Sequence, residues 1–311
     1  MPNQDLINKL NGILLPFTTP FDKDGQILSD ALRANLSKWN VTGITGYAAL
    51  GSTGERVHLD EREYLQIIET ARAAVPSSMA FIAGAGQQSV VGTINEIKKA
   101  ASAGADAVLV ITPNFYRTAI NQDSLLHFYR VVADASPVPL LLYSMPALTG
   151  IRVEPETIAE LSSHPNIIGV KDSSNDMAGF KSTVELCPHS FAVMTGNGTV
   201  LLDALRAGAT GGILAVGCTV PEMCVEILRT HRTGEAETAS ELQAKLTPLA
   251  AAVTTRFGIG GLKTALELAG YVGGLVRAPL RMPEQSARDE IKLLFDEATS
   301  SLGAQAARQT S

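Results

Sequence analysis

The first two thirds of the chain alternate between short apolar runs and longer amphipathic segments. A short apolar run bounded by turn-forming residues is typical of a buried strand, whereas apolar positions three and four residues apart are typical of a helix. The strands are therefore expected at residues 12–17, 46–50, 80–83, 106–111, 140–143, 167–171, 191–194 and 212–216. The helices are expected at residues 30–39, in a segment after residue 60, and at 91–103, 123–135, 155–162, 177–186 and 199–207.

Eight strand–helix units within about 220 residues predict a (β/α)8 barrel, or TIM barrel. An open, doubly wound sheet also alternates strands and helices, but it usually carries a glycine-rich loop that binds a dinucleotide. The segment GAGQQS at 84–89 lacks the third glycine of such a loop. The pattern therefore favours the barrel.

The pattern changes beyond residue 220, where helical periodicity continues without further strands. The expected helices cover residues 222–231, 235–253, 262–268 and 284–302, and a polar tail follows at 305–311. No linker composition separates them from the barrel. We therefore expect a barrel over residues 1–220 and a C-terminal helical extension over residues 221–311.

Charge and composition narrow the classes of function. A formal net charge of -6 argues against a nucleic-acid-binding surface, which is normally basic. No apolar run reaches the roughly 18 residues of a membrane span. The N-terminal segment contains Asp5 and few basic residues, unlike a signal or transit peptide, so a cytoplasmic location is expected, with mitochondrial import as the alternative. The three cysteines lack CxxC spacing and are expected to be reduced.

One lysine stands at a chemically unusual position. Lys171 ends the apolar run of IIGVKDSS at 167–174, at the carboxyl end of the sixth expected strand. Burial favours the neutral form of an amine, which is the form that attacks a ketone to make a Schiff base. The alternative interpretation is a lysine whose long stem reaches past the strand end to solvent.

Other strand ends in a barrel meet the same active-site face. The loop GSTGE at 51–55 combines two glycines with two hydroxyls, so that backbone N–H groups can bind an anion, although an ordinary tight turn fits the same residues. Tyr143 ends the fifth strand, where a core tyrosine is the alternative. The loop TGNG at 195–198 has little side-chain volume and leaves space for a substrate.

Together these residues suggest Schiff-base chemistry on a 2-oxo acid. The amine of Lys171 would form a carbinolamine and then an iminium, while Tyr143 moves protons at a 4-hydroxyl group and Thr53 orients Tyr143. The loop N–H groups would hold the substrate carboxylate. The five histidines lack metal-ligand spacing, so a metal-dependent aldolase site is not expected. A GxSxG elbow and a P-loop are also absent from the sequence.

The motifs GSTGE at 51–55, YSMPALTG at 143–150, GVKD at 169–172 and GNG at 196–198 resemble the family of dihydrodipicolinate synthase and N-acetylneuraminate lyase. The resemblance covers nearly the whole chain. It implies a TIM barrel, a homotetramer and catalysis without a metal or other cofactor. It also implies that Lys171 bears the Schiff base, that Tyr143 is the proton shuttle, and that Ser52 and Thr53 bind the pyruvyl carboxylate and assist the relay.

Departures from the family patterns bear on the substrate. Leu148 occupies the place where the synthase typically has an arginine that binds its aldehyde substrate, and Phe115, beside Tyr116, replaces the second tyrosine of a typical pair. The lyase typically has an Asp-Glu pair where this chain has Thr199 and Val200. The segments at 136–150, 164–173, 251–263 and 270–280 are more similar to 4-hydroxy-2-oxoglutarate aldolase, which typically has asparagine at the position of Thr53.

We therefore expect a class I aldolase that cleaves a 4-hydroxy-2-oxo acid, such as 4-hydroxy-2-oxoglutarate or a 2-oxo-3-deoxy sugar acid, to pyruvate and an aldehyde. The alternatives are a synthase that condenses pyruvate with an aldehyde, and a non-catalytic barrel that binds 2-oxo acids. The expected catalytic residues are Lys171, Tyr143 and Thr53. The expected substrate-binding residues are Gly51, Ser52, Thr53, Phe115, Tyr116, Leu148, Gly196 and Asn197.

Overall fold

The structure, a computed structural model, describes residues 4–300. The expected polar tail at 305–311 and the last two residues of the helix expected at 284–302 lie outside the described residues. Among the residues described, no helix is both long and apolar enough to cross a membrane.

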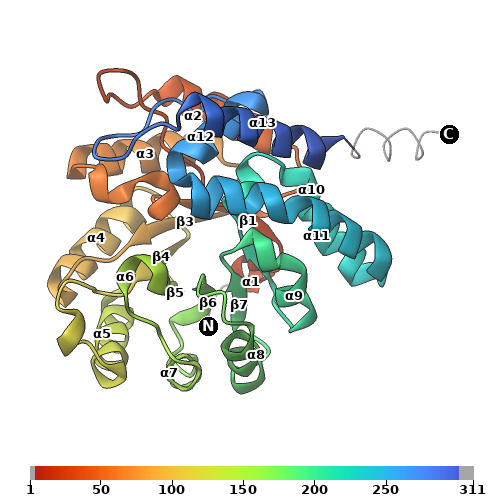
Figure 1. The fold of residues 1–311 in the computed structure, drawn as a ribbon. Helices are drawn as coiled ribbons and strands as arrows, with labels where there is room; N and C mark the ends of the chain where they lie inside the picture. Colours follow the sequence, from red (N-terminus) through yellow and green to blue (C-terminus); the bar gives the residue numbers. More distant parts are fainter. Residues whose placement is uncertain (1–3, 301–311) are drawn as a thin grey trace.

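Eight parallel strands form a closed barrel in which each strand pairs with the next one along the chain, and β8 pairs with β1 (Figure 1). The predicted TIM barrel is therefore confirmed. The strands are β1 Ile13–Leu15, β2 Gly46–Ala49, β3 Ala80–Ala85, β4 Ala107–Ile111, β5 Leu140–Ser144, β6 Ile167–Asp172, β7 Ala192–Thr195 and β8 Gly211–Ile213.

Alternation along the strands separates two layers of apolar side chains. On β5, Leu141 belongs to the cluster that fills the barrel interior, whereas Leu142 belongs to the larger cluster between strands and helices. On β6 the register shifts at Ile168, so Ile168 joins the interior cluster and Val170, two residues later, joins the outer one. Helix α1 (Gln4–Leu10), which the periodicity did not predict, buries two leucines in the interior cluster. The interior is thus a packed core, and the space for chemistry lies at its ends.

The helices that follow the strands surround the barrel (Figure 1). They are α2 Ser29–Trp39, α3 Glu61–Ala74, α4 Val90–Ser102, α5 Gln122–Ala135, α7 Pro155–Leu161, α8 Met177–Leu186 and α9 Leu201–Arg206. An additional short helix, α6 Pro146–Thr149, lies within a segment expected to be a loop. It follows β5 directly and therefore stands over the carboxyl ends of the strands.

Four helices complete the described chain: α10 Pro221–Thr233, α11 Ala236–Ala251, α12 Gly258–Leu268 and α13 Gln285–Thr299. Helix α10 contacts α9 and β1, and so continues the ring around the barrel. Helix α13 contacts both α11 and α12, and a π-helical segment, η6 Ala252–Arg256, joins α11 to α12. These helices lie together on one side of the ring, at the blue end of the colour scale in Figure 1. The division of the chain at residue 221 stays a prediction.

Candidate active site

Lys171 and Tyr143 lie side by side because their strands are in register. They are paired residues of β5 and β6, so their side chains leave the same face of the sheet at the carboxyl end of the barrel. Both are buried, with 4% and 3% of their surface exposed. The Lys171 Nζ atom lies 4.5 Å from the centroid of the Tyr143 ring. The amine is therefore held against an aromatic face in the barrel mouth, and its stem does not carry it to solvent.

The tyrosine hydroxyl connects β5 to the loop that follows β2. Tyr143 Oη and Ser52 Oγ are 3.1 Å apart, within hydrogen-bond distance. Ser52 begins a 3-10 turn, Ser52–Gly54, in which Thr53 is buried. Among the described residues the hydroxyl bonded to Tyr143 belongs to Ser52, although Thr53 was expected to orient the tyrosine. A part for Thr53 in the relay stays a prediction.

Left-handed backbone conformations flank the GSTG turn at residues 51–54. Leu50 has φ 57° and Glu55 has φ 56°, values that a non-glycine residue adopts only when its surroundings impose them. At the Leu50 end, Gly84 on β3 makes room for this conformation, because a Cβ atom there would lie 2.2 Å from the Leu50 carbonyl oxygen. The loop that carries Ser52 therefore begins packed closely against β3.

The loop after β7 contacts the lysine directly. A Cβ atom on Gly196 would lie 2.8 Å from Lys171 Cε and 1.9 Å from Ser173 Oγ, so a side chain there would collide with both. Asn197 uses its amide oxygen to accept a hydrogen bond from the Thr199 backbone N–H at 2.9 Å, and its amide nitrogen donates to Asn175. Asn197 thus shapes the loop, and its contact with substrate stays a prediction.

Three expected binding residues lie farther out, on the rim. Phe115 is 74% exposed, Tyr116 70% and Leu148 60%. The Phe115 and Tyr116 rings meet edge to face with centroids 5.1 Å apart, and the Gln88 side-chain oxygen accepts the Phe115 backbone N–H at 2.8 Å. The structure thus brings these residues to the mouth but leaves their apolar surfaces uncovered.

Two groups near the site were missed by sequence reasoning. Asp172 follows Lys171 and is buried; burial raises the pKa of its carboxyl group, opposed by hydrogen bonds from Ser174. Lys263 on α12 is fully buried against Glu55, the last residue of GSTGE. Asp172 is the acidic residue of the GVKD motif and Glu55 that of the GSTGE motif, so the sequence contained a local signal for each. The partner of Glu55, Lys263, is too distant along the chain to have been inferred from spacing.

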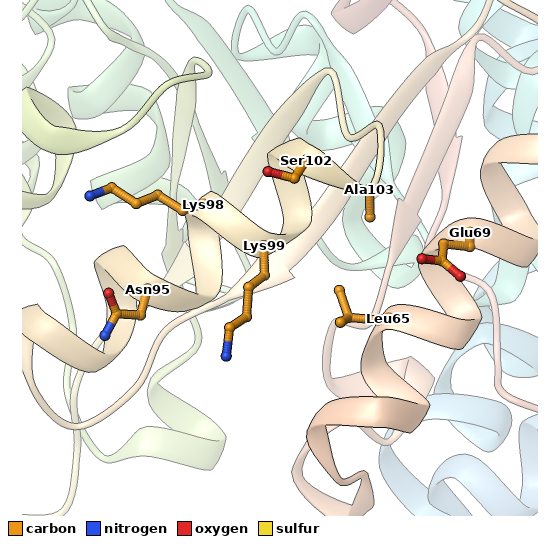
Figure 2. Close-up of a pocket in the computed structure, with 7 residues that line it drawn as sticks. All are labelled: Leu65, Glu69, Asn95, Lys98, Lys99, Ser102 and Ala103. Atoms are coloured by element: carbon orange, nitrogen blue, oxygen red, sulfur yellow. The ribbon is translucent and has the colours of Figure 1, made fainter.

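A separate groove of about 490 Å³ runs along the outside of the barrel between α3 and α4. Figure 2 shows Leu65 and Glu69 on one side and Lys98 and Lys99 on the other. All of its lining residues belong to the two helices or their ends, and none to the loops that carry Lys171, Tyr143 or Ser52. Within residues 4–300, no group of three or more His, Cys, Asp or Glu side chains is arranged to hold a metal ion.

Comparison with known proteins connects this geometry to a family. The sequence model of the dihydrodipicolinate synthetase family matches residues 9–298. A 4-hydroxy-tetrahydrodipicolinate synthase of Methanothrix thermoacetophila is 33% identical over 280 residues, covering 90% of this chain and 92% of that protein. A protein of Emericella nidulans described as a probable mitochondrial 4-hydroxy-2-oxoglutarate aldolase is 32% identical over 302 residues, covering 96% of each.

Solved structures agree with these relatives. A prophage protein of E. coli K12, described as belonging to the dihydrodipicolinic acid synthase family and crystallised with pyruvate, superposes with a TM-score of 0.86 at 28% identity. The match covers 93% of this chain and 98% of that one. The barrel, the order of its motifs and these matches lead to one conclusion: the chain belongs to the dihydrodipicolinate synthetase family.

Proposed function

We propose that this protein is a class I aldolase that uses Lys171 to form a Schiff base with a 4-hydroxy-2-oxo acid. One observation supports this above the others: the buried Lys171 amine lies 4.5 Å from the Tyr143 ring, and the hydroxyl of that ring is 3.1 Å from Ser52. An amine, a phenol and a serine hydroxyl in contact are the functional groups needed to form an imine and to transfer protons.

The proposed reaction begins when neutral Lys171 adds to the C2 ketone; the carbinolamine takes up one proton from solvent and loses water, giving an iminium. The C4 hydroxyl proton then passes along the Tyr143–Ser52 hydrogen bond to solvent, the C3–C4 bond breaks, and its electrons move into the iminium to form an enamine. The aldehyde departs. A proton returns to C3, and water hydrolyses the new iminium, which releases pyruvate and restores the amine.

The substrate carboxylate is assigned to the turn at residues 51–54. Backbone N–H groups of a glycine-bounded turn converge on an anion, and the Ser52 and Thr53 hydroxyls stand in the same turn. The iminium is the electron sink in this scheme, so we propose that the reaction needs neither a metal nor an organic cofactor.

Leu148 guides the choice of substrate. The side chain is 60% exposed above the mouth and is apolar, where a synthase of this family typically carries an arginine for its aldehyde substrate. Leu148 therefore counts against the synthase substrate. The segments that resemble 4-hydroxy-2-oxoglutarate aldolase, together with a 32% identical relative described as a probable enzyme of that kind, favour cleavage of 4-hydroxy-2-oxoglutarate to pyruvate and glyoxylate, with a 2-oxo-3-deoxy sugar acid next. Condensation of pyruvate with aspartate semialdehyde is the second candidate, because relatives at 31–33% identity are described as synthases.

The setting of the reaction is also a proposal. We place the protein in the cytoplasm and expect it to work as a homotetramer, as the family resemblance implies. Its three cysteines are free thiols, and Cys218 and Cys224 are buried, which suits a reducing compartment.

Borohydride trapping tests the mechanism. Reduction in the presence of pyruvate is expected to attach one three-carbon unit to Lys171, which mass spectrometry of a peptide digest locates. Lys171→Ala is expected to lose the adduct and turnover while it keeps the native circular dichroism spectrum. Lys181→Ala on α8, a lysine with a 66% exposed side chain, is the matched control and is expected to behave as wild type. An adduct on another lysine, or none, would reject the proposal.

The substrate is tested by coupling pyruvate release to lactate dehydrogenase. The panel contains 4-hydroxy-2-oxoglutarate, a 2-oxo-3-deoxy sugar acid and N-acetylneuraminate, and a parallel assay supplies pyruvate with aspartate semialdehyde. Preference for 4-hydroxy-2-oxoglutarate is expected. Faster condensation with aspartate semialdehyde would establish the second candidate. Trapping of pyruvate without turnover of any of these substrates would favour a 2-oxo acid binding protein.

A further inference from the structure

A buried ion pair lies directly behind the turn that carries Ser52. Lys263 Nζ on α12 and Glu55 Oε1 are 2.6 Å apart, and the two side chains are 0% and 1% exposed. Glu55 ends the GSTGE motif, and Lys263 lies in the part of the chain beyond the barrel strands. The pair therefore connects the substrate loop to the C-terminal helices.

Every polar atom of this pair is used. Lys263 Nζ donates its two other hydrogen bonds to the backbone oxygens of Thr19, at 2.7 Å, and Leu275, at 2.5 Å. The second Glu55 oxygen accepts the Arg277 backbone N–H at 3.0 Å and lies 3.2 Å from His58 Nδ1. An ammonium group has three donors and a carboxylate accepts several bonds, so this arrangement satisfies both charges.

Stability alone is a weak reason for such a pair. Desolvation of two charges costs about as much as their attraction returns, and apolar residues of similar size are often equally stable in the same place. Hydrogen bonds with fixed directions do specify geometry, which apolar contacts do not. The geometry specified here is that of the turn.

Two short connections lead from Lys263 to Ser52. The first runs through Glu55, which has φ 56° and ψ 33° and whose backbone N–H donates to the Ser52 carbonyl oxygen at 3.1 Å. The second runs through Thr19. The Thr19 carbonyl oxygen accepts a hydrogen bond from Lys263, and the Thr19 hydroxyl donates to the Gly54 carbonyl oxygen at 2.8 Å. Ser52 in turn contacts the Tyr143 hydroxyl.

We propose that Glu55 and Lys263 are positioning residues that hold the 51–54 turn in the shape that receives the substrate carboxylate. Helix α12 thereby sets the preference of the site for 2-oxo acids over neutral ketones. This inference rests on the proposed function. It adds that carboxylate recognition depends on a pair that touches neither the substrate nor Lys171.

The test compares two ketones that differ in charge. Pyruvate and pyruvamide present the same carbonyl carbon to Lys171, but only pyruvate carries a carboxylate. The concentration that half-saturates borohydride trapping is measured for each, in wild type and in Glu55→Gln. We expect the value for pyruvate to rise roughly 10-fold or more, because a small displacement of positioned groups has effects of that size, and the value for pyruvamide to stay within about twofold.

A purely structural role predicts a different result. Partial unfolding would reduce trapping of both ketones equally, and that outcome, or an unchanged value for pyruvate, overturns the proposal. Glu290→Gln removes a partner of Arg256 in an exposed ion pair of the same C-terminal region and is the matched control, expected to keep both values. If wild type traps neither ketone, the proposed Schiff-base function itself fails, which is a separate outcome.

The double variant Glu55→Gln/Lys263→Met keeps the test valid if the single variant unfolds. It removes the buried charge that Glu55→Gln leaves with a weaker partner, so its melting temperature is expected to exceed that of the single variant. The selectivity for pyruvate is expected to remain lost. A double variant that folds and recovers wild-type selectivity would contradict the positioning role.

Discussion

Tyr143 presents two chemically different surfaces to the site. Its ring face lies 4.5 Å from Lys171 Nζ, where the π electrons would stabilise the cationic iminium of the proposed reaction and the ring excludes water. Its hydroxyl lies 3.1 Å from Ser52 Oγ and belongs to the proposed proton path. Because one side chain would perform both tasks, a substitution that keeps the ring and removes the hydroxyl separates them.

Tyr143→Phe is therefore expected to form the Schiff base and to stall afterwards. General acid–base catalysis contributes roughly 10² to 10⁴ in rate, so kcat is expected to fall by about that factor. Borohydride trapping of pyruvate on Lys171 is expected to continue, since the ring that shields the amine remains. Steady-state kinetics and mass spectrometry measure the two properties separately.

Tyr129→Phe is the matched control for this substitution. The Tyr129 hydroxyl is buried as well, but it donates to the Val110 carbonyl oxygen at 3.1 Å, in the layer between strands and helices. The control is expected to lose about 1 kcal/mol of stability and to keep kcat. Equal losses of kcat in the two variants would show that the Tyr143 hydroxyl has no special part in catalysis.

At the scale of elements, strong periodicity predicted the fold well. The expected helix at 177–186 has the observed bounds of α8, Met177–Leu186, and all eight expected strands form, each with at least one end shifted by one to three residues. Helix α6 was missed because four residues cannot display a helical period. Helix α1 is also short, and its two leucines are buried only because they pack into the cluster that fills the barrel interior, a contact that local periodicity does not reveal.

The residues of the candidate site also fall into those that the sequence pattern predicts and those that it does not. Residues at strand ends could be found because a barrel gathers its strand ends on one face, and Lys171, Tyr143 and Ser52 do meet there. The choice between Ser52 and Thr53 as the partner of Tyr143 depends on the turn geometry of adjacent residues, which periodicity does not describe. The Glu55–Lys263 pair depends on how α12 docks, and its residues lie about 200 positions apart.

A second ion pair attaches α3 to the segment after α12. Arg277 grips the Glu63 carboxylate with two hydrogen bonds, at 2.5 Å and 2.7 Å, and both side chains are less than one fifth exposed. These bonds hold the pKa of Glu63 below its ordinary value of 4.5. Because the pKa of Glu63 is lower in the folded protein than in the unfolded chain, the pair stabilises the fold fully above pH 4.5. This stabilisation is lost as the pH falls through the pKa of the folded protein.

Glu63→Gln is therefore expected to lower the free energy of unfolding at pH 7 by about 1.5–3 kcal/mol, the usual worth of a hydrogen bond to a charged group. The difference from wild type is expected to shrink as the pH falls below about 4.5, measured by urea unfolding at a series of pH values. Glu185→Gln, in an exposed pair with Lys181, is expected to change little at any pH. A difference that persists undiminished in acid would contradict the ion-pair explanation.

At the scale of the whole molecule, the rim carries apolar surface that a single chain leaves uncovered. Phe115 and Tyr116 are 74% and 70% exposed, and Val57, after β2, is 83% exposed. The loops that carry these residues follow β2 and β4, which are separated by β3, and both lie at the same end of the barrel. Contiguous exposed aromatic surface is characteristic of protein–protein contacts. The proposed homotetramer provides a partner for it, namely another copy of this chain.

Phe115→Asp/Tyr116→Asp is expected to disrupt that contact, because burying two carboxylates in an apolar interface is unfavourable. Analytical ultracentrifugation is expected to give wild type a mass near four times the 32.8 kDa of one chain, and the variant a smaller assembly. Val41→Asp, at an 85% exposed residue just before β2 and so at the opposite end of the barrel, is the control and is expected to keep the wild-type mass. If the variant keeps the wild-type mass and activity, the rim is not the contact between copies. The exposed aromatic surface of Phe115 and Tyr116 would then be explained by substrate binding alone.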